Sequence, residues 1–281
     1  YYPQAGITCN TVTMHERAGT RALPEDLIKV DDVISAYYDI TPDPTDVGQR
    51  VAFGTSGHRG SSLDAKFNEA HIIAITAAII EYRASQGING PLFIGRDTHA
   101  LSEPAWRTAL EVLAAAGIET RIDSRGSYTP TPAVSVAILG ANGAPANLRT
   151  EGDGLADGIV VTPSHNPPRD GGFKYNPPHG GPADTDATGW IAARANELLD
   201  SGEWKNVPRV TGSDLLHDPN IKPFDYLDFY VSQLDQVIDI EAIRKAGVRI
   251  GADPLGGASI DYWAAIGEHY GLDLTVVNPE V

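Results

Sequence analysis

The chain has 281 residues, of which 42% are hydrophobic, and a formal net charge of −16. This length suggests one large or two ordinary domains with sizeable cores. An acidic chain lacks the broad basic surface that nucleic acids require, and its longest apolar run, at 72–80, is well short of the roughly 20 residues that span a bilayer. We therefore expect no nucleic-acid and no membrane partner, while a small phosphate ligand stays compatible with a few local cations. The single cysteine, Cys9, excludes an intrachain disulfide and favours the cytoplasm.

The apolar spacing along the chain predicts alternating helices and strands. Helical spacing indicates helices at 26–39, 69–86, 102–117, 131–139, 188–199, 224–238, 240–246 and 259–270. Short apolar runs between turn residues indicate strands at 92–94, 118–122, 158–161, 248–250 and 272–277. The residues before the only methionine, Met14, carry neither charge nor periodicity, so we interpret 1–13 as a tag or an upstream mis-start. The alternation is typical of an α/β fold.

Two segments, 93–122 and 249–277, share one order of elements. In each, a strand leads through Gly-x-Asp to a helix that contains a tryptophan, and a glycine separates that helix from another strand. This echo predicts a duplicated α/β unit, whose second copy has only begun at Val281. The alternative is chance likeness, because α/β units share turn residues and spacing.

The most informative stretch is Thr162–Pro168, with the sequence TPSHNPP. The apolar strand expected at 158–161 leads into it, which would place Ser164 at the carboxyl end of a strand, where open α/β sheets carry their chemistry. The serine is not part of a Gly-x-Ser-x-Gly elbow, and neighbours on an extended chain point apart. We therefore do not expect Ser164 and His165 to form a nucleophile–base pair. The alternative is an ordinary polar turn, since Ser, Asn and Pro are common turn formers.

The glycine-rich segment Phe53–Gly60 and Lys174 are candidate anion ligands. The glycines let backbone amides approach an anion, Thr55 and Ser56 add hydroxyl donors, and Arg59 adds a bidentate fork. The segment lacks the Gly-Lys-Ser/Thr ending of a Walker loop, so a plain glycine turn is the alternative. Lys174 lies between glycines and aromatic residues, either as a desolvated cation aimed at the Ser164 turn or as a solvated loop lysine.

The histidines do not have the spacing of a metal site. His58, His99 and His165 match no motif such as His-Glu-x-x-His, and with one cysteine in the chain we expect no zinc site. We expect loop anchoring, not catalysis, from the charged residues after two of the predicted strands: Arg96, Asp97 and Asp253.

Taken together, six segments resemble the motifs of the α-D-phosphohexomutase superfamily, and most closely its bacterial phosphoglucomutases: 53–60, 95–99, 129–132, 162–167, 171–176 and 251–257. The resemblance implies a reversible conversion of glucose 1-phosphate to glucose 6-phosphate, with a phosphosugar as the binding partner. Ser164 would be phosphorylated in the resting enzyme and would give its phosphoryl group to the sugar. The glucose 1,6-bisphosphate so formed, which the resemblance also implies as activator, would return its other phosphoryl group to the serine.

The resemblance also implies roles for the other candidates. Mg²⁺ would bind the phosphate on Ser164 and act as a Lewis acid. Lys174 would assist proton transfer at the sugar hydroxyl, and His165 would shape the loop around the phosphoserine. The phosphate groups would be contacted by Thr55, Ser56, Arg59 and Lys174.

The family is similar to a four-domain assembly whose aspartate-rich metal loop lies in the second domain. We accordingly expect a three-layer α/β/α domain with a mixed sheet, carrying the phosphoserine loop, over 14–215, and the start of a second similar α/β domain, truncated, over 216–281. No Asp-x-Asp-x-Asp-Arg cluster occurs in the sequence. The aspartate ligands of the metal are thus absent from this chain, and we expect little or no mutase activity from it in isolation.

Two alternatives to a glucose phosphate mutase stay open. The Gly-His-Arg-Gly ending and the His-Asn-Pro-Pro continuation favour glucose, but a related mutase would act on mannose or glucosamine phosphates. The other alternative is a non-catalytic phosphosugar-binding remnant, in which Ser164 would resist phosphorylation by glucose 1,6-bisphosphate.

Overall fold

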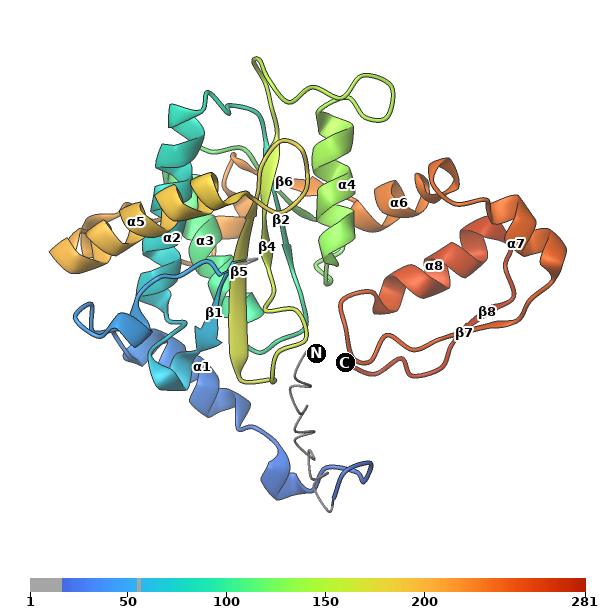
Figure 1. Cartoon of the computed structure of the whole chain (residues 1–281), viewed down its shortest axis with the longest axis horizontal. Helices are drawn as coiled ribbons and strands as arrows, with labels where there is room; N and C mark the ends of the chain where they lie inside the picture. Colours follow the sequence, from blue (N-terminus) through green and yellow to red (C-terminus); the bar gives the residue numbers. More distant parts are fainter. Residues whose placement is uncertain (1–16, 55–56) are drawn as a thin grey trace, which may run out of the picture.

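The structure is a computed structural model that describes residues 17–54 and 57–281 (Figure 1). The expected tag at 1–13 and two of the expected phosphate ligands, Thr55 and Ser56, lie outside the described residues.

The central feature is a six-stranded sheet with the order β1-β5-β4-β2-β3-β6. Its parallel strands are β2 (Leu92–Arg96), β3 (Thr120–Asp123), β4 (Asp157–Val161) and β6 (Ile221–Phe224). At the other edge, β5 (Asp170–Asn176) runs antiparallel to β4, and β1 (His58–Ser61) runs antiparallel to β5. The mixed sheet that we expected is therefore confirmed.

Helices cover both faces of this sheet (Figure 1). One face packs on α2 (Glu69–Ser85), α3 (Ser102–Ala115) and α5 (Thr185–Ser201), with α1 (Val30–Asp39) beside them, and the other on α4 (Thr131–Ala141) and α6 (Tyr226–Val231). Successive residues of a strand point to opposite faces, and in β4 the side chains of Ile159 and Val161 join the first core whereas Val160 joins the second. Every residue of β4 is buried, as in a strand covered on both sides. The three-layer prediction is confirmed.

Two strands, β1 and β5, were not among the strands we expected, and both contain glycines. Glycine is depleted in strands, but here its missing side chain lets other elements approach. A Cβ on Gly171 would overlap the ring of Phe67, and one on Gly172 would overlap Thr162 and Pro163 at the start of the serine loop. The glycines therefore serve close packing within the sheet, and the alternatives of a plain glycine turn at 58–60 and of a loop lysine at 174 were wrong.

The boundaries of two C-terminal elements also differ from the expectation. The predicted helix at 224–238 is shorter, because Asp225 caps α6 by accepting a hydrogen bond from the Asp228 amide, and α6 ends at Val231. The preceding residues form β6, which pairs with β3, so the first sheet continues beyond the boundary expected at 215. The domain division itself stays a prediction.

The second unit contains α7 (Ile240–Ala246), β7 (Ile250–Ala252), α8 (Ile260–Tyr270) and β8 (Leu274–Val276). Strands β7 and β8 are parallel and α8 joins them, which is the arrangement of β2, α3 and β3 in the first unit. Within the described part of the chain, no helix is both long and apolar enough to cross a membrane.

Two buried histidines support the edge of the sheet near the glycine-rich segment. The rings of His58 on β1 and His71 on α2 lie 5.0 Å apart. The Nε2 atom of His71 lies 2.7 Å from the Gln49 carbonyl oxygen, and its Nδ1 atom accepts from the Asn68 amide. Burial and the nearby His71 lower the pKa of His58 to about 3, and burial lowers the pKa of His71 to about 4. Both rings are therefore neutral at pH 7.

These histidines predict acid sensitivity. Because their folded pKa values lie below the unfolded value of about 6.5, the unfolded chain takes up protons first as the pH falls, and stability is lost between about pH 6.5 and 4. From pH 7 to pH 5 we expect the pair to lower the free energy of unfolding by about 4 kcal/mol, about 2 kcal/mol per ring. Urea unfolding at several pH values measures this slope. The variant His71→Gln should lose about half of it, and an unchanged slope would contradict the assignment.

Candidate active site

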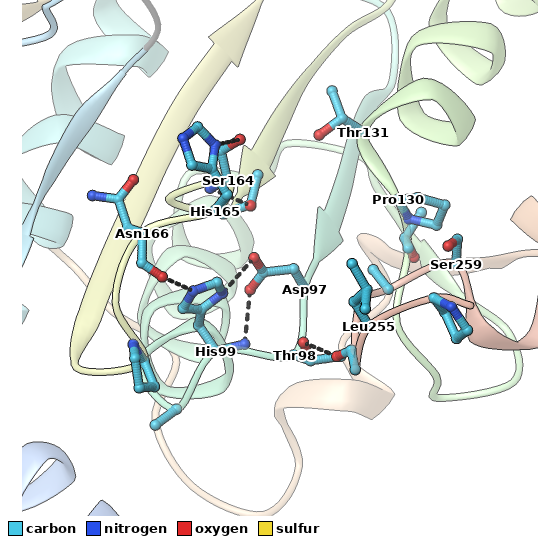
Figure 2. A pocket seen from close by; sticks show the side chains of 18 of the residues that line it. Asp97, Thr98, His99, Pro130, Thr131, Ser164, His165, Asn166, Leu255 and Ser259 are labelled. Carbon is cyan, nitrogen blue, oxygen red and sulfur yellow. Dashed lines mark hydrogen bonds and ion pairs between the residues drawn. The ribbon is translucent and has the colours of Figure 1, made fainter. Parts of the chain in front are cut away.

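A cavity of about 840 Å³ opens where the parallel strands β2 and β4 end (Figure 2). Its walls in the first unit come from the segments that follow these strands, from the start of α4 and from Ile28 and Val30 at the start of α1. Its other wall is the turn at 254–259 of the second unit. Ser164, His165 and Asn166 line the cavity, as do Asp97, Thr98 and His99. The serine thus follows a buried strand and faces a cavity at its carboxyl end, as the sequence indicated.

Ser164 has an unusual backbone conformation. Its φ of +83° lies in the left-handed region, which residues with a side chain rarely adopt. The turn is held from the preceding residues, since the Ser164 amide donates to Thr162 Oγ1 at 2.9 Å. Strain at a single residue persists only when its surroundings impose it, and such residues cluster at functional sites. The result is an exposed hydroxyl on a fixed turn.

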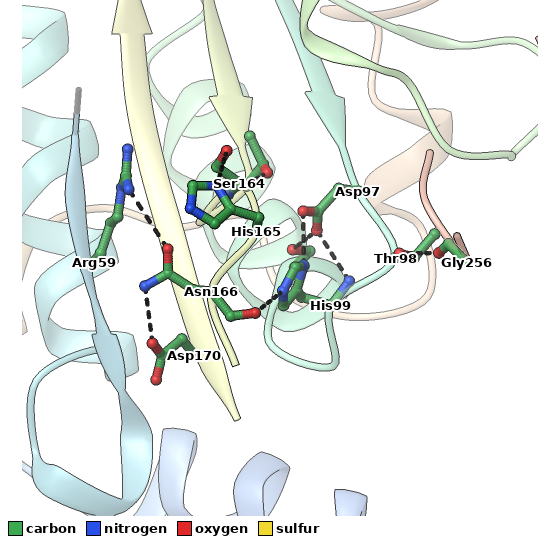
Figure 3. Close-up of polar contacts among 11 residues, drawn as sticks. Arg59, Asp97, Thr98, His99, Ser164, His165, Asn166, Asp170 and Gly256 are labelled. Carbon is green, nitrogen blue, oxygen red and sulfur yellow. Dashed lines mark hydrogen bonds and ion pairs between the residues drawn. The ribbon is translucent and has the colours of Figure 1, made fainter. Parts of the chain in front are cut away.

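His165 corrects one of our expectations. Its Nδ1 atom lies 3.3 Å from Ser164 Oγ, within reach of a weak hydrogen bond (Figure 3). We expected adjacent side chains to point apart, as they do on an extended chain. The left-handed φ of Ser164 breaks that alternation and turns both side chains to the same side. The imidazole of His165 therefore lies beside the hydroxyl of Ser164.

Asp97 and His99 hold the serine loop from the neighbouring strand. The Nδ1 atom of His99 lies 2.8 Å from Asp97 Oδ2, and its Nε2 atom lies 3.1 Å from the carbonyl oxygen of Asn166. Burial alone would raise the pKa of Asp97, but hydrogen bonds from His99, Ser102 and Thr162 lower it below its usual value. Burial opposes the charge on His99, yet the hydrogen bond and charge of Asp97 raise its pKa above the usual value.

The contact of His99 with the serine loop was missed from the sequence. The only signal was the short Asp-Thr-His spacing at the end of a strand, which does not reveal a partner 67 residues away.

Arg59 and Lys174 are brought to one face of the sheet by the pairing of β1 with β5. Arg59 on β1 pairs directly with Gly172 on β5, and paired residues of neighbouring strands lie on the same face of a sheet. Residues two apart on a strand also share a face, so Lys174 lies on the same face as Gly172 and Arg59. Arg59 Nη1 lies 3.5 Å from Asn166 Oδ1, and Asn166 in turn donates to Asp170 at 3.0 Å (Figure 3). Arg59 thereby contacts the serine loop through Asn166.

Lys174 is half-buried beside Gly57 and lines a smaller cavity of about 80 Å³. Burial and the charge of Arg59 lower the pKa of its ammonium group. Thr131, at the start of α4, lines both this cavity and the large one. Lys174 is thus a partly desolvated cation near the serine loop, although it does not line the large cavity.

Comparison with known proteins identifies the family. The family model "Phosphoglucomutase/phosphomannomutase, alpha/beta/alpha domain I" matches residues 50–201, which carry β1 to β5 and the serine loop. The chain belongs to this family.

Individual phosphohexomutases match different shares of the chain. A phosphoglucomutase of Komagataeibacter xylinus is 53% identical over 94% of this chain and 46% of its own length. A phosphoglucosamine mutase of Bordetella pertussis is 34% identical over 48% of this chain and 28% of its own length. The open-form structure of the Paramecium phosphoprotein parafusin, a phosphoglucomutase, gives a TM-score of 0.63 at 20% identity and covers 86% of this chain and 44% of that one. The chain spans less than half the length of these relatives, and the last likeness shows the fold alone.

Phosphohexomutases generally use Mg²⁺, and the described residues do not fit this ion. Among residues 17–54 and 57–281, no group of three or more His, Cys, Asp or Glu side chains is placed to hold a metal. Asp97 is the only carboxylate among the described residues that line the large cavity. Its two oxygens already accept hydrogen bonds from His99 and Ser102. Octahedral Mg²⁺ needs further oxygen ligands, which these residues do not supply.

Proposed function

We propose that this chain carries the phosphorylated serine of an enzyme that interconverts glucose 1-phosphate and glucose 6-phosphate. The observation that carries the proposal is the exposed hydroxyl of Ser164, fixed in a left-handed turn above a cavity of about 840 Å³. A family member named a phosphoglucomutase, 53% identical to this chain, supports glucose phosphates as the substrates.

The reaction consists of two phosphoryl transfers. The sugar hydroxyl at C6 attacks the phosphorus on Ser164; the new O–P bond forms as the P–Oγ bond breaks, and the hydroxyl proton passes to a base. The glucose 1,6-bisphosphate reorients, and its C1 phosphoryl group moves to Ser164 Oγ, which leaves glucose 6-phosphate. The bisphosphate is also the activator, because it phosphorylates an unmodified serine.

Charge explains the roles of the two cations. A phosphoserine carries roughly −1.5 to −2 charges at neutral pH, so an incoming phosphosugar is repelled unless positive charge lies nearby. Arg59 reaches the serine loop through Asn166, and Lys174 lies on the same face of the sheet. Burial lowers the pKa of Lys174, so its ammonium group loses a proton more readily than that of a solvated lysine. We assign the charged form the role of cation and the neutral amine the role of accepting the proton of the sugar hydroxyl. His165 shapes the loop, with its Nδ1 atom 3.3 Å from the serine hydroxyl.

Phosphorylation of the chain tests the proposal directly. Although we expect little or no mutase turnover from this chain in isolation, phosphorylation of Ser164 is a single transfer. We expect long incubation with glucose 1,6-bisphosphate and MgCl₂ to add one phosphoryl group, which peptide mass spectrometry should locate on Ser164. A chain that stays unmodified, or one modified at another serine, would contradict the proposal and favour a phosphosugar-binding remnant.

Replacing Lys174 with glutamine should slow this phosphorylation by about two orders of magnitude, because one preorganised positive charge beside the serine loop is lost. The first-order rate constant at saturating glucose 1,6-bisphosphate is the measurement. The control is Lys205→Gln, which changes a lysine stacked on Trp204 away from the site and should leave the rate unaltered. Equal rates for the two variants would remove Lys174 from the mechanism.

A second candidate substrate follows from the relative named a phosphoglucosamine mutase, which is 34% identical over 144 residues. Under this alternative, glucosamine 1,6-bisphosphate phosphorylates Ser164 faster than the glucose compound. We expect the reverse order, and a comparison of both donors, with mannose 1,6-bisphosphate as the third, decides the sugar.

A further inference from the structure

Three consecutive residues after β2 make contacts in different directions (Figures 2 and 3). Asp97 accepts hydrogen bonds from the backbone amide of His99 at 3.0 Å and from Ser102 Oγ at 2.5 Å, which fix it to the start of α3. His99 reaches the serine loop at the carbonyl oxygen of Asn166. Thr98, between them, donates its hydroxyl to the Gly256 carbonyl oxygen of the second unit at 2.7 Å.

The contact of His99 is specific in its chemistry. Both groups that face its ring nitrogens are acceptors, the Asp97 carboxylate at 2.8 Å and the Asn166 carbonyl at 3.1 Å. The ring satisfies both only as a donor from each nitrogen. The side chain is 14% exposed, so water does not readily replace these partners. His99 therefore fixes the backbone two residues after Ser164.

The contact of Thr98 falls on a constrained turn. Leu255 and Gly256 both have left-handed φ values, +52° and +69°, and the Leu255 amide donates to Asp253 at 2.8 Å. This turn forms the wall of the large cavity opposite Ser164. A displacement of the turn therefore pulls on the same short segment that holds the serine loop.

We propose that the segment Asp97–His99 couples the turn at 253–257 to the serine loop, and that His99 is a positioning residue for phosphoryl transfer. When the turn is in place, Thr98 is held and His99 keeps Asn166, and with it Ser164, in the geometry for transfer. When the turn moves away, the segment loosens and the serine loop with it. The coupling itself requires no substrate, whereas the effect on phosphoryl transfer rests on the proposed function.

Hydrogen exchange of the full chain tests the coupling without any substrate. The variant Thr98→Val removes only the hydroxyl that donates to Gly256. We expect roughly tenfold faster exchange both in the peptide that contains 253–257 and in the one that contains 164–166, because one hydrogen bond is worth about a factor of ten in local opening. The variant Thr98→Ser keeps the hydroxyl and should restore both. Thr45→Val, which removes an exposed hydroxyl bonded to Asp43, is the matched control. Faster exchange at 253–257 alone would overturn the coupling.

The variants of His99 test positioning. We expect His99→Leu to lower the maximal rate of Ser164 phosphorylation by glucose 1,6-bisphosphate about tenfold or more, with little change in the concentration that gives half of that rate. His99→Gln, which still donates one hydrogen bond, should recover part of the loss, and the exposed His217→Gln is the control. Unchanged exchange at 164–166 in His99→Leu would overturn the positioning role. If the unaltered chain is not phosphorylated at all, the proposed function fails, and the exchange measurements still decide the coupling.

Discussion

Replacing Ser164 with alanine is expected to abolish phosphorylation of the chain by glucose 1,6-bisphosphate and to leave the free energy of unfolding within about 0.5 kcal/mol of its original value. The hydroxyl is exposed, and its one polar neighbour among the described contacts is His165 Nδ1 at 3.3 Å, so little is lost from the fold. The matched control, Ser213→Ala, alters another exposed serine and should be phosphorylated normally at residue 164.

A glycine at position 164 is expected to have opposite effects on phosphorylation and on the free energy of unfolding. Ser164 has a φ of +83°, and a left-handed conformation costs a residue with a side chain roughly 1–2 kcal/mol. Glycine avoids this cost, although its greater freedom in the unfolded chain offsets about 0.4–1 kcal/mol of the gain. We therefore expect Ser164→Gly to raise the free energy of unfolding by about 0.5–1 kcal/mol while phosphorylation is lost.

Urea unfolding of both variants, beside mass spectrometry after incubation with the bisphosphate, measures the two effects. A glycine variant less stable than the alanine variant would show that the turn is not strained. Residual phosphorylation of either variant would place the acceptor elsewhere.

The sequence predicted the parallel strands and the place of Ser164 because both depend on local patterns. The run Gly158–Val161 is apolar and leads into a turn, and its side chains are buried on both faces. The strands β1 and β5 were not predictable in the same way. Gly171 and Gly172 favour a loop locally, and the reason for a strand is Phe67 and Pro163, which only the fold brings there.

The site shows the same division between local and distant causes. Arg59 and Lys174 were recognised as candidate phosphate ligands from composition, but their shared face follows from the register of two unexpected strands. The approach of His165 to the Ser164 hydroxyl follows from a φ that serine rarely adopts, so the local sequence argued against it. The bond from His99 to Asn166 joins residues 67 apart in the chain and has no sequence signature.

A buried ion pair lies at the end of β4 opposite to Ser164. Its loss is expected to change the free energy of unfolding more than any other substitution considered. Arg83 of α2 and Asp157 of β4 have exposed fractions of 2% and 0%, and their Nε and Oδ2 atoms are 2.9 Å apart. Arg83 also donates to the Gly90 carbonyl oxygen at 2.7 Å, and the Tyr175 hydroxyl donates to Asp157 at 2.6 Å. Burial raises the pKa of Asp157 to about 6 although Arg83 and Tyr175 both act to lower it.

Arg83→Leu is expected to lower the free energy of unfolding by about 3–5 kcal/mol at pH 7, because it leaves the Asp157 carboxyl buried without its cation. The deficit should shrink toward pH 5. The folded pKa of Asp157 lies above its unfolded value of about 3.9 and rises further in the variant, so the folded state gains protons, and stability, as the pH falls. The measurement is the difference in free energy of unfolding, which is the difference between the two urea midpoints multiplied by their common slope. The buried histidines affect both proteins alike, so their contribution cancels in this difference.

Two further variants test whether the loss of stability in Arg83→Leu comes from an unpaired Asp157. Arg194→Leu removes a partly exposed guanidinium that binds Glu81 and Glu197, and it should cost at most about 1 kcal/mol. The double variant Arg83→Leu/Asp157→Leu removes both buried charges and should be more stable than Arg83→Leu alone, since an unpaired buried charge costs more than an apolar pair. If Arg83→Leu costs no more than Arg194→Leu, or if the double variant is the less stable one, the deficit does not come from an unpaired Asp157. Because β4 leads directly into the serine loop, a deficit of the expected size would also show that the strand presenting Ser164 is anchored at its far end by charge.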